Sequence, residues 1–333
     1  VDYPGEWLLD LGLMGKSYQD WSASVLDRIA KRDEARAFRD ASGGADADAK
    51  LDEASAKALA ASFTAYLTQA RENGYSDCTP GRFLLPGDLQ GSPVLTFAPL
   101  PAGSYARGSL GREFERRYDA YKREVVKPFF RDHFARIDRQ IVLVDVLEAL
   151  HSGPAAVEEL RQAMADILGA FRPGRNAFLS QLLLGKRVEK VLFAATKADH
   201  VHSAQHGQLT AITEALLADA KTRADFAGSQ TAAMAIAAFR ATTEDRVQRD
   251  GRDLDVVRGL LMNGRRAAFF PGRLPDDPGH ILTPARQGAE TWLDVDYQAM
   301  AFAPQKLTLR PGDGPPHIRL DRAMDFLIGD RLT

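Results

Sequence analysis

Four residues with the spacing of a nucleobase site, Thr196-Lys197-Ala198-Asp199, directly follow the apolar run Leu192–Ala195. A carboxylate at the fourth position can accept two hydrogen bonds, from the ring N–H and the exocyclic amine of guanine, whereas adenine offers no such pair. Such a site would reject ATP by roughly two to four orders of magnitude. The Lys197 stem would lie along the base, and Thr196 would tie this loop to a neighbouring one. The alternative is an ordinary strand-to-helix turn with Asp199 as N-cap, but a position at a strand end favours a binding role.

A second motif, of the DxxG type, stands at the start of the chain as Asp2-Tyr3-Pro4-Gly5-Glu6. In this motif the aspartate holds Mg²⁺, usually through water, and the glycine amide donates to the γ-phosphate of a bound nucleotide. Glu6 would stand where many GTPases keep a water-orienting Gln. Alone the motif is also a good turn, because of Pro4-Gly5. The order DxxG, strand, T-K-x-D, strand favours the nucleotide interpretation.

A third segment, Arg240-Ala241-Thr242, follows the apolar run Ala232–Phe239. GTPases place a short loop there whose backbone amide contacts the guanine carbonyl. The loop has almost no sequence signature, so without Thr196–Asp199 it would be interpreted as a plain connection.

Two other patterns are expected to carry no chemistry. Gly12–Ser17 ends like the phosphate loop GxxxxGK(S/T), but the first required glycine is Asp10, so Lys16-Ser17 is expected to open a helix. His200, His202 and His206 invite a metal interpretation, but no carboxylate-rich set accompanies them.

The elements that must position these residues alternate between strand and helix. Continuous apolar runs predict buried parallel strands at 140–145, 190–195 and 232–239, and helical periodicity predicts helices at 155–171 and 204–221. This alternation indicates an α/β fold with a parallel sheet covered on both faces.

The remaining segments follow other patterns. Helices are predicted within 17–75, from 110 to about 137, and at 320–328. Residues 80–108 carry many prolines and glycines, with Val94–Phe97 as a strand-like piece. Residues 249–316 break the alternation, with candidate strands at 267–270 and 292–303.

Composition narrows the class of protein further. With 333 residues and 45% apolar side chains, the chain can bury a sizeable core as a folded globular protein. A formal charge of −2 provides no field that would attract nucleic acid, so no nucleic-acid partner is expected. Cys78 is the only cysteine, which excludes an intrachain disulfide and fits the cytoplasm. No apolar run approaches the ~18–20 residues of a transmembrane helix.

Taken together, these residues resemble the YcjX-like family, bacterial stress-associated GTPases of Ras-like P-loop fold with a large helical insertion. The resemblance rests on phrases spread over the whole chain: Asp2–Asp10, Lys127–Phe130, Asp138–Asp145, Thr196–His200 and Arg319–Gly329. It implies an Mg²⁺-dependent GTPase of the bacterial cytoplasm that binds GTP and GDP. We expect a protein partner of unknown identity at the helical insertion, residues 17–137.

The resemblance also implies a division of the chain. We expect the end of the DxxG strand at 1–5, a helical insertion domain at 6–137, a nucleotide-binding α/β core at 138–248, an irregular β-containing subdomain at 249–316, and a C-terminal helix at 317–333 that packs on the core. Family members begin with a phosphate loop and a switch region, so we expect this chain to lack the first strands and, by itself, to be inactive.

Two alternatives from other classes remain open. One is a helical scaffold or adaptor that binds no nucleotide, in which the α/β part only supports the insertion. The other is an ATPase with a degenerate base site, against which Asp199 argues.

Overall fold

The computed structural model describes residues 4–133, 137–170, 188–224, 230–249, 251–292, 296–306, 310, 312 and 314–332. Two compact units make up the chain. Unit 1 comprises residues 1–137 and 166–186, and unit 2 comprises residues 138–165 and 187–333. No described helix is both long and apolar enough to cross a membrane.

Unit 1 is helical. Its α-helices are α1 (Gly5–Leu9), α2 (Tyr18–Ile29), α3 (Arg36–Gly43), α4 (Glu53–Glu72), α5 (Gly81–Leu84), α6 (Leu110–Tyr121) and α7 (Lys127–Asp132). A π-helical turn, Lys122–Val126, joins α6 to α7, and short 3₁₀ turns cover Asp10–Gly15, Asp33–Ala35, Gly87–Leu89 and Pro93–Leu95.

Polar caps fix where the main helices of unit 1 begin. Ser17 and Asp20 form a capping box at α2, and Asp52 accepts the Ser55 amide at 2.8 Å to cap α4. At α6 the cap is Ser109, whose hydroxyl accepts the Arg112 amide at 3.3 Å. Each side chain satisfies an amide that the first helical turn would otherwise leave unpaired.

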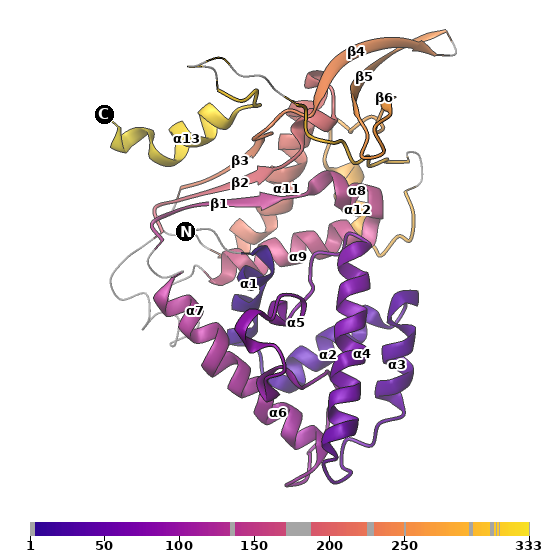
Figure 1. Ribbon diagram of the computed structural model, residues 1–333, viewed down its shortest axis with the longest axis vertical. Coiled ribbons are helices and arrows are strands. Elements are labelled where there is room, and N and C mark those ends of the chain that lie inside the picture. The colour runs from indigo at the N-terminus through magenta and orange to yellow at the C-terminus, as the bar shows by residue number, and fades with distance from the viewer. Residues whose placement is uncertain are drawn as a thin grey trace. The chain divides into compact units, whose positions relative to one another are not determined.

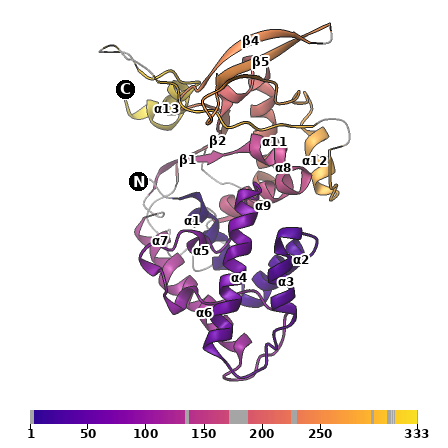
Figure 2. The ribbon, with the colours of Figure 1, turned by 45° about the vertical axis from the view of Figure 1, so that its right-hand side comes forward.

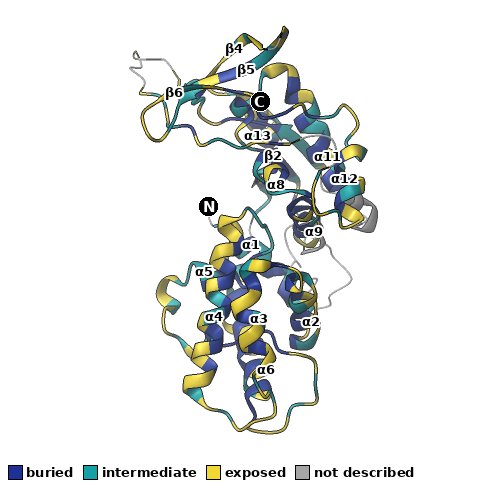
Figure 3. Ribbon diagram, turned by 90° about the vertical axis from the view of Figure 1, so that its right-hand side faces the viewer, coloured by how far each residue is buried: buried dark blue, intermediate teal, exposed yellow. Residues whose placement is uncertain are grey.

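Aromatic rings fill the centre of unit 1. Trp21 of α2 stacks on Tyr118 of α6 with ring centroids 5.1 Å apart, and the edge of Phe63 of α4 meets the same indole at 5.9 Å. Phe97 joins them from the proline-rich connector. Figure 3 shows the buried faces of these helices turned toward one another and the exposed residues turned outward. Burial of these large rings is the main force that holds the helices together.

The connector departs from the sequence prediction at Val94–Phe97. Residues Pro93–Leu95 form a 3₁₀ turn, with Pro93 in its first turn and the Ser92 hydroxyl as cap, so no strand forms there. Proline has no backbone N–H to give to a sheet and presets the φ of a turn. The wrong prediction came from Val94, Leu95 and Phe97: the turn buries the first two only in part, and Phe97, which follows it, is fully buried in the aromatic centre.

Unit 2 contains a three-stranded parallel sheet in the order β1-β2-β3. The strands are β1 (Arg139–Val144), β2 (Lys190–Ala195) and β3 (Gln230–Ala235), and in this register Val144 pairs with Ala195 and Ala195 with Ala235. The three carboxyl ends therefore lie side by side. This confirms the prediction of a parallel sheet, although β3 begins and ends earlier than the sequence indicated.

Helices cover the sheet. The α-helices of unit 2 are α8 (Val146–Ser152), the part of α9 (Pro154–Ala170) up to residue 165, α11 (His206–Ala224), α12 (Gly279–Arg286) and α13 (Leu320–Ile328). Its 3₁₀ turns cover Ala198–His200, Ser203–Gln205 and Gly329–Arg331. On one face Leu192 and Ala194 pack against Ala323 and Leu327 of α13. Helix α11 packs along β2 and β3, away from α13 (Figures 1 and 2).

Ion pairs hold the C-terminal turn to the amino ends of the strands. Lys190, at the start of β2, lies 2.9 Å from the Asp330 carboxylate, and Arg139, at the start of β1, also pairs with Asp330. Arg139 reaches Glu189 as well, at 2.9 Å. These contacts fix the end of the chain beside the sheet.

A second, antiparallel sheet was not predicted in full. It consists of β4 (Thr242–Arg249), β5 (Arg252–Leu260) and β6 (Arg266–Phe269), and β4 and β5 form a long ribbon (Figure 2). Only β6 had been expected. At 292–303 the described residues form an isolated bridge, Leu261 to Phe302, and no strand. Most of β4 is exposed or half-buried, so it lacks the apolar alternation from which strands are predicted.

Candidate functional site

The predicted base-binding loop begins at the carboxyl end of β2. Thr196 continues the strand pairing, since its amide donates to the Val144 carbonyl at 2.9 Å and its hydroxyl donates to the same oxygen at 3.3 Å. The tie to a neighbouring segment that was predicted for Thr196 therefore runs to the end of β1. Ligands of open α/β sheets bind at this edge.

Lys197 turns the chain out of the sheet. Its backbone is left-handed, with φ 59° and ψ 31°, a conformation that non-glycine residues rarely adopt. This turn lets the Ala198 amide donate to the Ile236 carbonyl at 3.0 Å. The Lys197 ammonium lies 2.5 Å from the carboxylate of Asp145, the residue that follows β1 and caps α8. The lysine is thus fixed at both ends, with its side chain still 45% exposed.

The Asp199 carboxylate lies beside the third predicted segment. The Ala241 amide donates to Asp199 Oδ2 at 2.8 Å, and the Thr242 hydroxyl donates to the Asp199 carbonyl. Asp199 is only 4% exposed, and among the described residues no hydrogen bond reaches its Oδ1. A nearly buried carboxylate therefore keeps one oxygen for a further donor.

The start of β4 is joined to the same loop a second time. The Ser203 hydroxyl donates to Glu244 Oε2 at 2.9 Å, and the Ser203 amide donates to the other Glu244 oxygen at 3.2 Å. The 3₁₀ turns at Ala198–His200 and Ser203–Gln205 are therefore held against the antiparallel ribbon.

Beneath the loop lies His206, the first residue of α11. Its Nε2–H donates to the Ala198 carbonyl at 2.8 Å, and its Nδ1 accepts from the Arg319 guanidinium at 3.2 Å. These partners require the neutral ring with the proton on Nε2. Burial, and next the nearby Arg319 charge, lower the pKa of His206, which also favours the neutral form.

A cavity of about 230 Å³ adjoins the lysine of the motif. Its lining includes Asp145, Lys197, His200, Gln298 and Met300. The His200 ring meets the Phe302 ring edge to face, 5.1 Å apart, and burial lowers the pKa of His200. The cavity is thus polar on the side of the strand ends and apolar on the side of residues 299–301.

The residues of the predicted DxxG element belong to unit 1, whereas the base loop belongs to unit 2. Asp2, the predicted Mg²⁺ ligand, lies outside the described residues. Gly5 and Glu6 open α1, and the Glu6 carboxylate accepts Arg71 of α4 at 2.8 Å. A close backbone crossing fixes this helix, because any Cβ on Gly81 would meet the Glu6 carbonyl oxygen at 2.4 Å.

The segment Gly12–Ser17 has the structural role expected for it. Lys16 leaves the 3₁₀ turn Asp10–Gly15 in extended conformation, pairs with Asp166 at 3.1 Å, and is followed by Ser17 as cap of α2. The segment is the start of a helix, as predicted. Over the described residues, no group of three or more His, Cys, Asp or Glu side chains could hold a metal ion, and the ring of His206 is bound to the loop and to Arg319.

Comparison with known proteins decides the family. The sequence model of the YcjX-like family, DUF463, matches residues 1–332. The chain belongs to the YcjX-like family. It is 38% identical over 349 aligned residues to the protein named Ras-like GTPase YcjX from Escherichia coli (strain K12), covering 100% of this chain and 72% of that protein. It is 34% identical over 347 residues to the protein of the same name from Shewanella oneidensis MR-1, covering 100% and 70%.

This YcjX-like chain brings the predicted residues of unit 2 together: Thr196, Lys197 and Asp199 on one loop, with Ala241 and Thr242 against it. Sequence reasoning did not find three of their partners, His206, Arg319 and Asp145. Only Asp145 carried a signal, since it follows a predicted strand next to β2. His206 was noticed only as part of a histidine cluster, and Arg319 has no motif around it.

Proposed function

We propose that this chain is a guanine-nucleotide-binding protein whose base site is the loop Thr196–Asp199. The observation that carries the proposal is the Asp199 carboxylate, held at the carboxyl edge of the sheet by the Ala241 amide at 2.8 Å, with Oδ1 left for a ligand. Guanine presents two adjacent N–H donors that a carboxylate can accept together. The names of the relatives, Ras-like GTPase, agree with this choice.

Lys197 has a supporting part in the proposal. Because Asp145 holds its ammonium at 2.5 Å, the aliphatic stem is presented as a surface on which one face of the base can lie. Asp145 then acts as a positioning residue, since it contacts the lysine and not the base.

The role we propose for the loop Arg240–Thr242 differs from the one that the sequence predicted. The Arg240 amide donates to the Pro316 carbonyl at 2.8 Å, and the Ala241 amide donates to Asp199. Both amides are engaged, so we assign this loop the role of orienting Asp199 in place of direct contact with the guanine carbonyl.

Hydrolysis of GTP with Mg²⁺ is the finer part of the proposal. Glu6 would orient the attacking water, and Gly5 would contact the γ-phosphate. The ion pair with Arg71 supports this role, because it would offset the charge of a carboxylate placed near a phosphate. Among the described residues no group of three or more His, Cys, Asp or Glu side chains could hold a metal ion, and we derive no step through Mg²⁺.

Competition among natural bases tests the proposal on the unmodified protein. Inosine nucleotides keep the ring N–H of guanine and lack its exocyclic amine, while adenine nucleotides lack both donors. We expect calorimetric affinities in the order GTP, ITP, ATP, with roughly tenfold lost at ITP and about a hundredfold or more at ATP. Equal affinity for the three would contradict base recognition by a carboxylate. Binding of none of them would favour the scaffold interpretation.

A further inference from the structure

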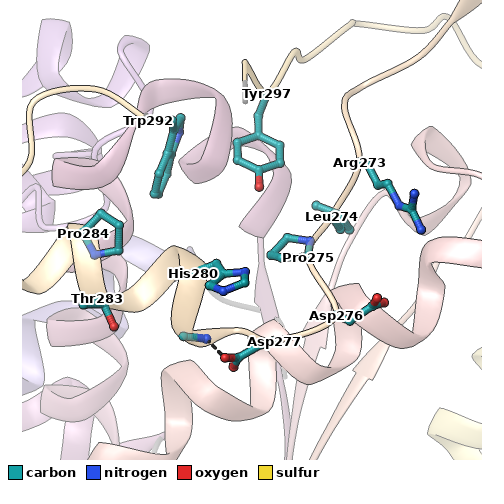
Figure 4. A pocket seen from close by; sticks show the side chains of 11 residues that line it. Arg273, Leu274, Pro275, Asp276, Asp277, His280, Thr283, Pro284, Trp292 and Tyr297 are labelled. Atoms are coloured by element: carbon teal, nitrogen blue, oxygen red, sulfur yellow. Dashed lines mark hydrogen bonds between the residues drawn. The ribbon is translucent and has the colours of Figure 1, made fainter. Parts of the chain in front are cut away.

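Unit 2 contains a larger cavity that the proposed nucleotide site does not use. Its volume is about 630 Å³, and it lies among helix α12, the segment 273–277 and the residues Trp292 and Tyr297 (Figure 4). This size falls in the range of small-molecule sites, which is about 300–1,000 Å³. The lining shares no residue with the Thr196–Asp199 loop.

Two aromatic rings form one wall, and α8 holds both of them. The Trp292 indole N–H donates to the Leu150 carbonyl at 2.9 Å, and the His151 ring donates to the Tyr297 carbonyl, also at 2.9 Å. The two rings meet edge to face, with centroids 5.6 Å apart and planes at 89°. Because main-chain contacts fix both residues, the wall is formed before any ligand arrives.

Tyr297 places its hydroxyl in the cavity. The residue is only 8% exposed, and its hydroxyl points into the space on the side of His280 and Pro275 (Figure 4). Among the described residues no hydrogen-bond partner reaches this oxygen. Burial raises the pKa of Tyr297, so the phenol stays neutral and can accept a hydrogen bond. The hydroxyl is open to the space of the cavity, so a ligand donor can take the place of water there.

The opposite side of the cavity is rich in carboxylate oxygens. Asp276 Oδ1 accepts Gln208 at 2.9 Å, and Asp277 Oδ1 accepts the Gly279 amide at 2.9 Å. No described donor reaches the second oxygen of either carboxylate. Arg273 also lines the cavity, so the two carboxylates leave an excess of one negative charge.

We propose that this cavity binds an organic cation, a guanidinium or ammonium group carried on a short apolar stem. The faces of Trp292 and Tyr297 attract a cation through their ring quadrupoles, and the carboxylates of Asp276 and Asp277 accept its N–H donors. The apolar stem would contact Pro275 and Pro284. The cation belongs either to a free amine or guanidine or to a basic side chain of a peptide.

Titration calorimetry with butylguanidinium, and with butylurea as its neutral counterpart of the same shape, tests the charge requirement. We expect butylguanidinium to bind at least tenfold more tightly than butylurea. The blocked peptide acetyl-Ala-Arg-Ala-amide distinguishes a basic side chain of a peptide from a free amine or guanidine as the source of the cation. Tighter binding of the peptide than of butylguanidinium assigns the site to a basic side chain, and weaker binding assigns it to a small molecule.

Variants place the binding in this cavity. Tyr297→Phe keeps the ring packing and removes only the hydroxyl, and should weaken butylguanidinium several-fold. Asp276→Asn with Asp277→Asn keeps the shape and should weaken it about tenfold or more. The matched control, Asp40→Asn with Asp253→Asn, removes two exposed charges elsewhere and should leave the affinity unchanged. No binding of butylguanidinium, equal binding of butylurea, or equal affinity in the cavity variants would overturn the proposal.

Discussion

The amide nitrogen of Ala241 lies 2.8 Å from Oδ2 of Asp199, although 42 positions separate the two residues in the chain. The next residue, Thr242, donates its hydroxyl to the Asp199 carbonyl. The first residues of the antiparallel ribbon therefore set the orientation of the carboxylate on which the proposed base recognition depends.

Thr242→Val should weaken GTP binding because it leaves the buried Asp199 carbonyl without its donor. We expect a loss of about fivefold to thirtyfold in affinity, corresponding to ~1–2 kcal/mol. Thr242→Ser keeps the hydroxyl and should restore most of the affinity. Thr243→Val, at the adjacent exposed position, serves as the control. Calorimetry of the three variants would contradict the account if Thr242→Val bound GTP as the unmodified protein does.

His206 should make the base site sensitive to acid. The pKa of its buried ring is lowered in the folded protein, so the unfolded chain takes up a proton that the folded protein does not. Stability is therefore fully present above the ordinary histidine pKa, ~6.5, and falls as the pH drops below it. Protonation would also turn Nδ1 into a donor facing the Arg319 guanidinium.

We expect the unfolding temperature of unit 2 and the GTP affinity to decrease between about pH 7 and pH 5. His206→Gln should be less stable at pH 7 but lose its own share of this dependence, while His200, whose pKa burial also lowers, keeps the remainder. His280→Gln, which changes an exposed histidine, should keep the full dependence. A His206→Gln profile that stays parallel to that of the unmodified protein would remove His206 as the cause.

The strands that position the site could be predicted where a strand is buried on both faces, because its sequence is then a continuous apolar run. The bounds of β2 agree with those expected, because Val191 to Ala195 are fully buried and the flanking residues are polar. The end of β3 was misplaced, because Ile236 and Ala237 are apolar although they leave the parallel sheet. Ala237 forms an antiparallel bridge with Ile318, a contact that no local pattern encodes.

The ribbon β4–β5 was missed for the opposite reason. Its stability comes from backbone pairing and from cross-strand ion pairs such as Arg246 with Asp255 at 2.9 Å, so its side chains show no apolar alternation. Gly251, with φ 72°, was the available turn signal. The loop Thr196–Asp199 was predictable because its chemistry fixes residue types at fixed spacing, whereas the contacts of His206 and Arg319 depend only on tertiary packing.

Asp10 should give unit 1 an unusual dependence on pH. It is 3% exposed, accepts the Gly81 amide at 2.8 Å and the Tyr121 hydroxyl, and burial raises its pKa from 3.8 to about 7. A raised carboxyl pKa means that the folded protein holds a proton that the unfolded chain releases. The stabilisation is complete below pH ~4 and is lost as the pH rises to about 7.

The unfolding free energy of unit 1 should thus fall by roughly 2–4 kcal/mol between about pH 4 and pH 7. Asp10→Asn keeps the acceptor for Gly81 and should flatten the profile, so that the variant is the more stable form at pH 8. Asp27→Asn, on the surface of α2, is the control. Denaturant unfolding at a series of pH values would contradict the prediction if Asp10→Asn and Asp27→Asn gave the same slope.

Substitution of Glu6 tests whether this residue of unit 1 has a catalytic role or only a structural one. If Glu6 orients the attacking water, Glu6→Ala should lower single-turnover hydrolysis of GTP by ~10²–10⁴ with GTP affinity nearly unchanged. Arg71→Gln breaks the same ion pair from the other side and should change stability by at most about 1 kcal/mol. Equal hydrolysis by the Glu6→Ala variant and the unmodified protein would leave Glu6 only its structural ion pair.

The central claim is that Asp199 recognises guanine by accepting its two N–H donors, and replacing this carboxylate by an amide tests it most directly. Asp199→Asn keeps the shape and an oxygen that can still accept the Ala241 amide, but it turns one acceptor into a donor. Xanthine carries a carbonyl where guanine has its amine, so the account predicts that the variant loses GTP affinity and gains affinity for xanthosine triphosphate, each by about tenfold or more. GTP affinity that is the same in Asp199→Asn and in the unmodified protein, measured by calorimetry side by side, would contradict it.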